Sequence, residues 1–151
     1  MIIEKGIFLI CKIGEEKIAL SIYGIREILW DIKVYPLPQV SEYIIGILAE
    51  EKKLAVVVDL AKFFNIKETA GNVFLKIKIN EKLAFLALKE VEEILEVREE
   101  EIYPCPPLFS STIPNYYISG LIKKEDTFIP IIDLTKILDH EEIKPFTFLS
   151  K

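Results

Sequence analysis

The chain has 151 residues, 51% of them hydrophobic, and its 19 basic and 24 acidic side chains give a net charge of −5. A chain of this length forms about one domain and can remove roughly 70% of its unfolded surface from water. Its acidic balance excludes the basic footprint of a nucleic-acid-binding protein. Its apolar runs are far shorter than the roughly 20 residues of a membrane crossing, and the N-terminus lacks the pattern of an export signal. We therefore predict a cytoplasmic protein with no nucleic-acid partner and no direct membrane insertion.

A β-hairpin is predicted at the start of each half of the chain. Residues 7–22 carry β-forming side chains on both sides of a Gly-Glu-Glu turn at positions 14–16. Residues 72–88 repeat this arrangement around an Asn-Glu turn at positions 80–81. Two runs of β-forming residues separated by so short a turn are typical of a hairpin.

Two further segments follow each hairpin in the same order. A short amphipathic connection spans residues 24–29 in the first half and residues 90–95 in the second. A crossing segment then contains a Tyr-Pro-X-Pro sequence, at positions 35–38 and again at positions 103–106. Proline lacks the N–H group that a central strand donates, so each crossing is expected at a sheet edge or in a loop.

The last part of each half is the clearest internal repeat. Residues 43–64 align without a gap on residues 117–138, a shift of 74 positions. In both copies an aromatic residue and a glycine, Gly46 or Gly120, lead through a charged patch into an apolar run. These runs are too short for helices and do not alternate, which indicates strands that are buried on both faces. We therefore predict a second hairpin in each half, anchored at its glycine.

Each apolar run ends at an aspartate that is followed by leucine, Asp59 in the first copy and Asp133 in the second. An aspartate in this position accepts hydrogen bonds from the free amides of a helical first turn, so we predict that both residues cap short helices. A remote alternative is a two-lobed aspartic hydrolase in which the two carboxylates share a proton. Such enzymes place a small hydroxyl residue and a glycine after each aspartate, whereas Leu60 and Ala61 follow Asp59 here.

Other catalytic patterns fail in this sequence. Its six glycines are isolated, so no glycine-rich loop can hold a phosphate. His140, the only histidine, lies near the C-terminus, and Cys11 and Cys105 have no metal-ligand spacing around them. We therefore predict a protein without enzymatic activity, cofactor or metal, whose two cysteines are structural thiols in a reducing compartment.

The order of these segments predicts a mainly β fold of two small barrels packed side by side. The whole chain, residues 1–151, is then a single domain, with repeats at about residues 7–64 and 72–138 and a C-terminal tail at residues 139–151. We expect residues 72–138 to superpose on residues 7–64 and to form the second barrel.

Eight short segments in this order resemble the CheW family of chemotaxis coupling proteins, over about residues 5–140. They read EEKIALSIYGIREIL, VYPLP, YIIGI, LAVVVDLAKFF, KLAFLALKEVEEIL, EEIYPCP, YISGLI and FIPIIDLTKIL. The resemblance implies two pseudo-symmetric, SH3-like barrels of five strands each, with a few short helices. It also implies a non-catalytic adaptor that binds the regulatory domain of the histidine kinase CheA and the cytoplasmic tips of chemoreceptors.

Residues that match the family's motifs are candidates for partner contacts. The resemblance gives Ile25, Glu27 and Ile28 in the family's Val-X-Glu-Ile element, Tyr43, Ile44, Gly46 and Glu51 at the signature hairpin, and Gly120 in the second half. Some of these positions lie near the partner-binding surface in relatives, so we expect the chain to use the same region.

The chain departs from the family at the tip of the signature hairpin. Glu51 replaces the signature arginine, and Lys52 replaces the turn glycine. A partner that meets a cation in relatives would meet a carboxylate here, so we expect a cognate partner to present Lys or Arg at the facing position. Alternatively, Glu51 points into solvent or pairs with Lys52 or Lys53 within its own hairpin. The same departure leaves open a divergent scaffold that serves another signalling or motility pathway.

Overall fold

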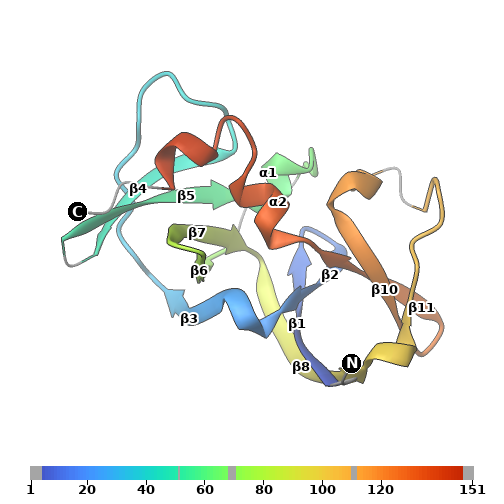
Figure 1. Cartoon of the computed structure of the whole chain (residues 1–151). Coiled ribbons are helices and arrows are strands. Elements are labelled where there is room, and N and C mark those ends of the chain that lie inside the picture. Colours follow the sequence, from blue (N-terminus) through green and yellow to red (C-terminus); the bar gives the residue numbers. More distant parts are fainter. Residues whose placement is uncertain (1–4, 51, 68–70, 110–111, 148–151) are drawn as a thin grey trace.

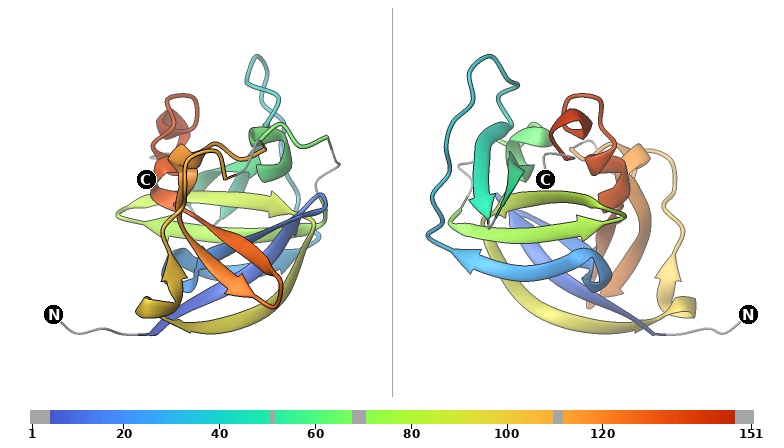
Figure 2. Two further views of the ribbon diagram at one scale, coloured as in Figure 1. Left: turned by 90° about the vertical axis from the view of Figure 1, so that its right-hand side faces the viewer. Right: turned by 60° about the vertical axis from the view of Figure 1, so that its left-hand side comes forward.

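The computed structural model describes residues 5–50, 52–67, 71–109 and 112–147, which form two β-sheets and a few short helices (Figure 1). One sheet has the strand order β8-β1-β2-β11-β10-β9 and the other the order β3-β6-β7-β5-β4. Each sheet curls around an apolar core of its own, and we call the two sheets barrel A and barrel B respectively (Figure 2). The predicted mainly β fold of two barrels with a few short helices is confirmed.

The bounds of the elements are as follows. Barrel A contains β1 (Lys5–Ile13), β2 (Glu16–Ser21), β8 (Glu90–Arg98), β9 (Ile102–Tyr103), β10 (Ile118–Lys124) and β11 (Thr127–Ile132). Barrel B contains β3 (Ile25–Trp30), β4 (Ile44–Glu50), β5 (Lys53–Asp59), β6 (Val73–Ile79) and β7 (Lys82–Leu88). The helices are α1 (Leu60–Phe63) and α2 (Leu134–Leu138), with 3-10 turns at η1 (Ile22–Gly24), η2 (Glu99–Glu101), η3 (Asn115–Tyr117) and η4 (Lys144–Phe146). Among the described residues, no helix has the length and apolar character to span a membrane.

Each barrel draws strands from both halves of the sequence repeat. The first hairpin, β1–β2, joins strands β8 to β11 of the second half, and the hairpin β6–β7 joins strands β3 to β5 of the first half. Strand β2 runs parallel to β11 through Ala19 and Ile131, and β7 runs parallel to β5 through Phe85 and Val57. The expectation that residues 72–138 form the second barrel by themselves is therefore wrong.

The exchange follows from the burial of the central strands. Strand β7 is buried on both faces from Leu83 to Leu88, so an open edge along it would leave backbone groups unpaired and away from water. Its own hairpin partner β6 covers one edge, and β5 of the other half covers the second edge. Strand β2 has the same relation to β1 and β11. A strand from the other half is thus needed to pair the second edge of the buried strand in each hairpin.

Irregularities in the strand pairing recur at equivalent places of the two halves. The pairing of β3 with β6 leaves Arg26 without a partner as a β-bulge, and the pairing of β8 with β1 leaves out Glu92 in the same way. These two residues are 66 positions apart, as are the turns of the two first hairpins. In both second hairpins the strand pairing leaves out the residue before the glycine, Gly46 or Gly120. These two glycines are 74 positions apart. These two shifts define the counterparts on the hairpins and edge strands that are compared below, and the Tyr-Pro crossings are matched through their pairing with β4 and β10.

Three apolar cores hold the molecule together. The largest lies between the barrels and includes Leu75 and Leu86, while Phe8 lies in the core of barrel A and Phe85 in the core of barrel B. Alternation along β7 sends Leu86 to the shared core and Phe85 into barrel B. Burying each such side chain contributes about 1.5–3 kcal/mol. The shared core therefore joins the two barrels through the same strands that form them.

The two short helices begin at the aspartates singled out above. Asp59 Oδ1 accepts a hydrogen bond from the backbone N–H of Lys62 at 3.1 Å. Asp133 Oδ1 accepts hydrogen bonds from the backbone N–H groups of Thr135 at 3.0 Å and Lys136 at 3.4 Å. Each carboxylate is thus bonded to its own helix, which is the geometry of a helix cap and not of a carboxylate pair that shares a proton.

The C-terminal segment packs on barrel B as far as residue 147. Ile143 is fully buried in the core between the barrels. The carbonyl oxygen of Thr147 accepts a hydrogen bond from the backbone N–H of Leu83 at 3.2 Å. These contacts make the described part of the tail a component of the folded domain.

Candidate functional site

The candidate residues Ile25, Glu27 and Ile28 lie on β3, an edge strand of barrel B. Ile25 and Ile28 are half-buried and pack against the core between the barrels, whereas Glu27 is exposed. Trp30, at the end of the strand, is 60% exposed. The amphipathic connection of residues 24–29 is therefore mainly an edge strand with apolar side chains at the margin of the shared core.

Strand β8 is an edge strand of barrel A and the counterpart of β3. Val91 corresponds to Ile25 and packs against the shared core, while Ile94 corresponds to Ile28 and is 62% exposed. The two strands lie on the same side of the molecule in all three views (Figures 1 and 2). Trp30 and Ile94 are exposed, and Ile25, Ile28 and Val91 are half-buried at the margin of the shared core; we call these five residues the edge surface.

Sequence reasoning missed Trp30 and Ile94. For Ile94 a signal was present, because the shift of 66 positions maps it onto the candidate Ile28. Large apolar side chains exposed on an edge strand invite association, so proteins place them there chiefly where another molecule binds. The edge surface therefore has the composition of a docking site.

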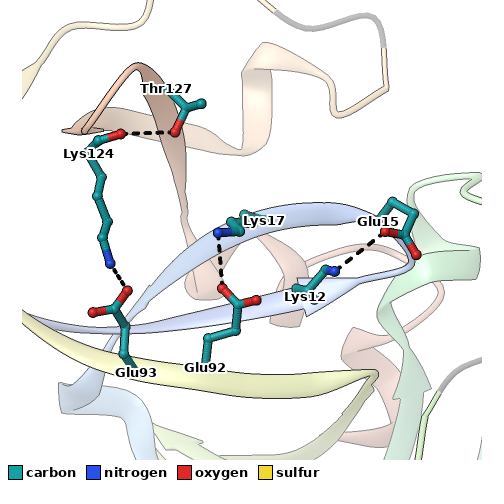
Figure 3. Close-up of polar contacts among 7 residues, drawn as sticks. All are labelled: Lys12, Glu15, Lys17, Glu92, Glu93, Lys124 and Thr127. Atoms are coloured by element: carbon teal, nitrogen blue, oxygen red, sulfur yellow. Dashed lines mark hydrogen bonds and ion pairs between the residues drawn. The ribbon is translucent and has the colours of Figure 1, made fainter.

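A charge cluster ties β3 to the tip of the hairpin β4–β5. The ammonium group of Lys76 on β6 lies 3.7 Å from Glu27 Oε1 and also contacts Glu50 Oε1. The hydrogen bond with Glu50, followed by the charges of Glu50 and Glu27, raises the pKa of Lys76. In barrel A a direct pair between Glu93 and Lys124 joins the corresponding strands, β8 and β10 (Figure 3). Both barrels thus fasten the edge strand to the second hairpin by ion pairs.

In each half, the Tyr-Pro crossing and the second hairpin each contribute one exposed large side chain. These are Tyr35 and Leu54 in barrel B and their counterparts Tyr103 and Phe128 in barrel A, all between 42% and 49% exposed. The rings of Tyr103 and Phe128 meet edge to face with centroids 5.5 Å apart. Each tyrosine belongs to a Tyr-Pro crossing, which pairs with the first strand of the hairpin. We call these two pairs the hairpin patches.

The candidates Gly46 and Gly120 are buried where the crossing meets the hairpin. A Cβ atom at Gly46 would lie 2.1 Å from the carbonyl oxygen of Tyr35, and one at Gly120 would lie 2.8 Å from the Cγ2 atom of Ile102. Only glycine permits an approach as close as that at Gly46. Both glycines therefore position the hairpin patches through backbone packing.

The candidates Tyr43 and Ile44 precede the same hairpin. Ile44 is buried in the shared core. The ring of Tyr43 meets that of His140 edge to face with centroids 5.8 Å apart, and its hydroxyl donates a hydrogen bond to Glu142. Burial, with a further contribution from this hydrogen bond, raises the pKa of Tyr43 to about 12. The remaining candidate, Glu51, lies outside the described residues.

The exposed apolar side chains of the described residues provide surfaces for binding. None of their His, Cys, Asp and Glu side chains form a group of three or more that could hold a metal ion. Burial raises the pKa of Cys11 to about 12, so its thiol is protonated and unreactive at neutral pH. Apolar side chains exposed on edge strands and hairpins define a protein that binds other macromolecules.

Comparison with known families specifies this class of binding protein. The family model described as the CheW-like domain matches residues 8–142. The chain therefore belongs to the CheW-like domain family. The CheW proteins of this family are scaffold proteins without catalytic activity, and the chain is not an enzyme.

Individual relatives are similar along most of their length. The chain is 21% identical to the chemotaxis protein CheW of Treponema pallidum over 140 residues, which are 88% of this chain and 82% of that protein. It is 25% identical to the probable chemotaxis protein CheW of Rhizobium etli over 134 residues, covering 87% of this chain and 86% of the relative. The crystal structure of the scaffolding protein TtCheW from Thermoanaerobacter tengcongensis matches with a TM-score of 0.81 at 26% identity, covering 91% of this chain and 94% of that chain. Low identity with nearly full coverage marks a divergent member.

Proposed function

We propose that this protein is a cytoplasmic adaptor that couples chemoreceptors to a CheA-type histidine kinase. The observation that carries the proposal is the presence of two kinds of exposed apolar surface on one domain, the edge surface and the hairpin patches. An adaptor needs separate docking sites, and apolar patches with charged rims provide both binding energy and partner selection. Membership of a chemotaxis scaffold family supports the same function.

We assign the edge surface to the receptor tip. Its residues come from one edge strand of each barrel and lie at the margin of the shared core. A helical partner can lay an apolar stripe along such a surface, as helices do in other apolar grooves. Ile25 and Ile28 would contact the stripe, and Glu27 beside them would favour a receptor helix with a basic flank.

We assign the hairpin patches to the regulatory domain of the kinase. In the family this domain is itself CheW-like, so one barrel of each protein can meet the other pseudo-symmetrically. Aromatic side chains dominate the binding energy of protein interfaces. The edge-to-face pair of Tyr103 and Phe128 is therefore the expected anchor, held in place by the packing around Gly120.

Two charge insertions test these assignments, with each variant serving as the control for the other. Ile94→Glu should weaken binding of a receptor signalling fragment by roughly 30-fold, about 2 kcal/mol, and leave binding of the kinase regulatory domain unchanged. Phe128→Glu should have the reverse effect. Both side chains are exposed, so neither variant should unfold, which circular dichroism verifies. If the unaltered protein binds neither fragment from its own genome at high micromolar concentration in calorimetry, coupling is contradicted.

A divergent scaffold of another signalling or motility pathway is the second candidate, and Glu51 is the observation that favours it. Like charges brought together at a desolvated interface cost several kcal/mol. Glu51→Arg should therefore strengthen binding to kinases or receptors of ordinary relatives and weaken the cognate complex. Calorimetry on both pairs measures this effect. Equal affinities before and after the substitution would mean that residue 51 takes no part in partner recognition.

A further inference from the structure

A cleft of about 660 Å³ opens between barrel A and the turn of hairpin β6–β7. Its lining includes a group of large apolar side chains, namely Phe8, Ile102 and Ile131 of barrel A, Ile79 of β6 and Leu134 of α2. No residue of the edge surface or of the hairpin patches lines it. Its volume falls within the range of about 300–1,000 Å³ that is typical of small-molecule sites. The cleft is thus a feature separate from the docking surfaces described above.

Two cations, Arg26 and Lys78, are among the residues that line this cleft. Arg26 is the bulge residue of β3, and Lys78 lies near the end of β6. A bulge redirects the side chain that it carries, which here belongs to a lining residue of the cleft. Within the described part of the chain, neither cation forms an ion pair. In a protein of net charge −5, two unpaired cations in a cleft with apolar lining residues favour an anionic ligand.

The counterparts of these two cations are paired within the fold. At the bulge of the other half, Glu92 lies 3.3 Å from the ammonium group of Lys17. Lys12, near the end of β1, is the counterpart of Lys78, and its ammonium group lies 3.4 Å from Glu15 Oε1 (Figure 3). The fold therefore provides ion pairs at these positions in barrel A and leaves the two charges of barrel B, which line the cleft, without an ion pair among the described residues.

A second departure from the repeat explains the open volume. Ser119 lines the cleft, whereas its counterpart Ile45 packs into the core of barrel B. Serine in place of isoleucine removes apolar volume and leaves a hydroxyl group that can bind a ligand. At the cleft, the sequence thus departs from its own repeat both in side-chain volume, at Ser119, and in unpaired charge, at Arg26 and Lys78.

We propose that this cleft binds a small amphipathic anion. Its apolar body lies against the apolar lining residues, and its single carboxylate or phosphate group lies at Arg26 and Lys78. Asp133 lines the cleft as well, and its negative charge opposes an anion at that end. The ligand is therefore oriented with its charge toward Arg26 and Lys78 and away from Asp133. The proposal does not depend on which kinase or receptor the protein couples.

Calorimetric titration with octanoate, and with 1-octanol as its uncharged analogue, tests the proposal. The full-length protein should bind octanoate saturably at one site and more tightly than octanol. The double variant Arg26→Gln/Lys78→Gln should lower octanoate affinity about tenfold, as expected for the loss of two solvent-accessible ion contacts, and leave octanol affinity unchanged. The control Lys67→Gln/Lys123→Gln removes two exposed cations that do not line the cleft and should change neither affinity.

The variant Ser119→Ile tests the volume independently of the charge. It places the side chain of the counterpart Ile45 in the cleft and should abolish binding of both octanoate and octanol while the circular dichroism spectrum is retained. If Ser119→Ile does not fold, the octanoate affinity of Arg26→Gln/Lys78→Gln tests the proposal alone. The proposal is overturned if octanoate shows no saturable binding, or if it binds the unaltered protein and Arg26→Gln/Lys78→Gln with equal affinity.

Discussion

Asp59 and Asp133 begin equivalent helices in the two halves of the molecule, but their surroundings differ. The backbone framework is the same, since Asp59 N–H donates to the carbonyl of Tyr43 at 2.7 Å and Asp133 N–H donates to that of Tyr117 at 2.8 Å. Asp59 is only 3% exposed, whereas Asp133 is half-buried and lines the cleft. Duplication has therefore preserved the hydrogen bonds that start each helix while the neighbouring side chains have diverged.

This difference shows how a repeated fold separates structure from function. The features that recur in both halves, such as the glycines and the aspartates, make backbone contacts that the fold requires. The features that differ, such as Ser119 against Ile45 and Phe128 against Leu54, lie at the cleft and the hairpin patches. Departures from the internal repeat thus coincide with the surfaces for which we propose binding of other molecules.

The largest expected effect comes from adding one methyl group at each repeated glycine. At Gly46 the new Cβ would meet the backbone oxygen of Tyr35 at 2.1 Å, so Gly46→Ala should lower the free energy of unfolding by roughly 3 kcal/mol or more. At Gly120 the nearest atom is a side-chain methyl of Ile102 at 2.8 Å, which can move, so Gly120→Ala should cost about 1 kcal/mol. Urea denaturation measures both. Equal losses would show that the two crossings are held in the same way.

An intermediate effect is expected where the ion pairs of the two barrels differ. Lys76→Met leaves the carboxylates of Glu27 and Glu50 without their shared cation and should cost about 2 kcal/mol. Lys124→Met removes a single, more exposed pair with Glu93 and should cost about 0.5–1 kcal/mol. Thermal and urea unfolding of both variants compare these values. The further substitution Glu50→Gln should recover part of the loss in Lys76→Met, and a lack of recovery would contradict repulsion as its cause.

Sequence reasoning reached the local elements because their signals are local. The turns at positions 14–16 and 80–81, the positions of Gly46 and Gly120, and the Asp-Leu pairs each fix a hairpin or a helix start within a few residues. The internal repeat then indicated two similar barrels. Short-range turn and cap chemistry is sufficient for such predictions.

The exchange of hairpins between the halves was not predictable from the same signals. The pairing of Ala19 with Ile131, or of Phe85 with Val57, joins residues far apart in the chain, and either pairing or its unexchanged alternative fits the apolar pattern. The sequence predicted only part of the edge surface. Ile94 is exposed because β8 lies at the edge of its sheet, and the order of strands in the sheet was not predictable from local signals. The cleft required comparison of the repeats in three dimensions.

The smallest expected effect concerns the buried aspartate and its dependence on pH. Burial raises the pKa of the Asp59 carboxyl, although the hydrogen bond from Lys62 N–H acts in the opposite direction. The Asp59 carboxyl therefore binds its proton more tightly in the folded protein than in the unfolded chain, where the pKa of an aspartate is about 3.9. The stability that this linkage contributes is fully present below the unfolded pKa and is lost as pH rises through the folded pKa.

Asp59→Asn removes this titration and keeps a side-chain oxygen at the cap. The stability of the variant, relative to that of the unaltered protein, should therefore increase as pH rises from about 3 to about 6. Asp133→Asn is the matched control, because it makes the same change at an equivalent cap that is more exposed. Urea denaturation across this pH range measures both differences. Since both variants retain the cap oxygen, a trend confined to Asp59→Asn assigns the effect to burial, whereas an equal trend in both would assign it to capping and contradict the difference between the two aspartates.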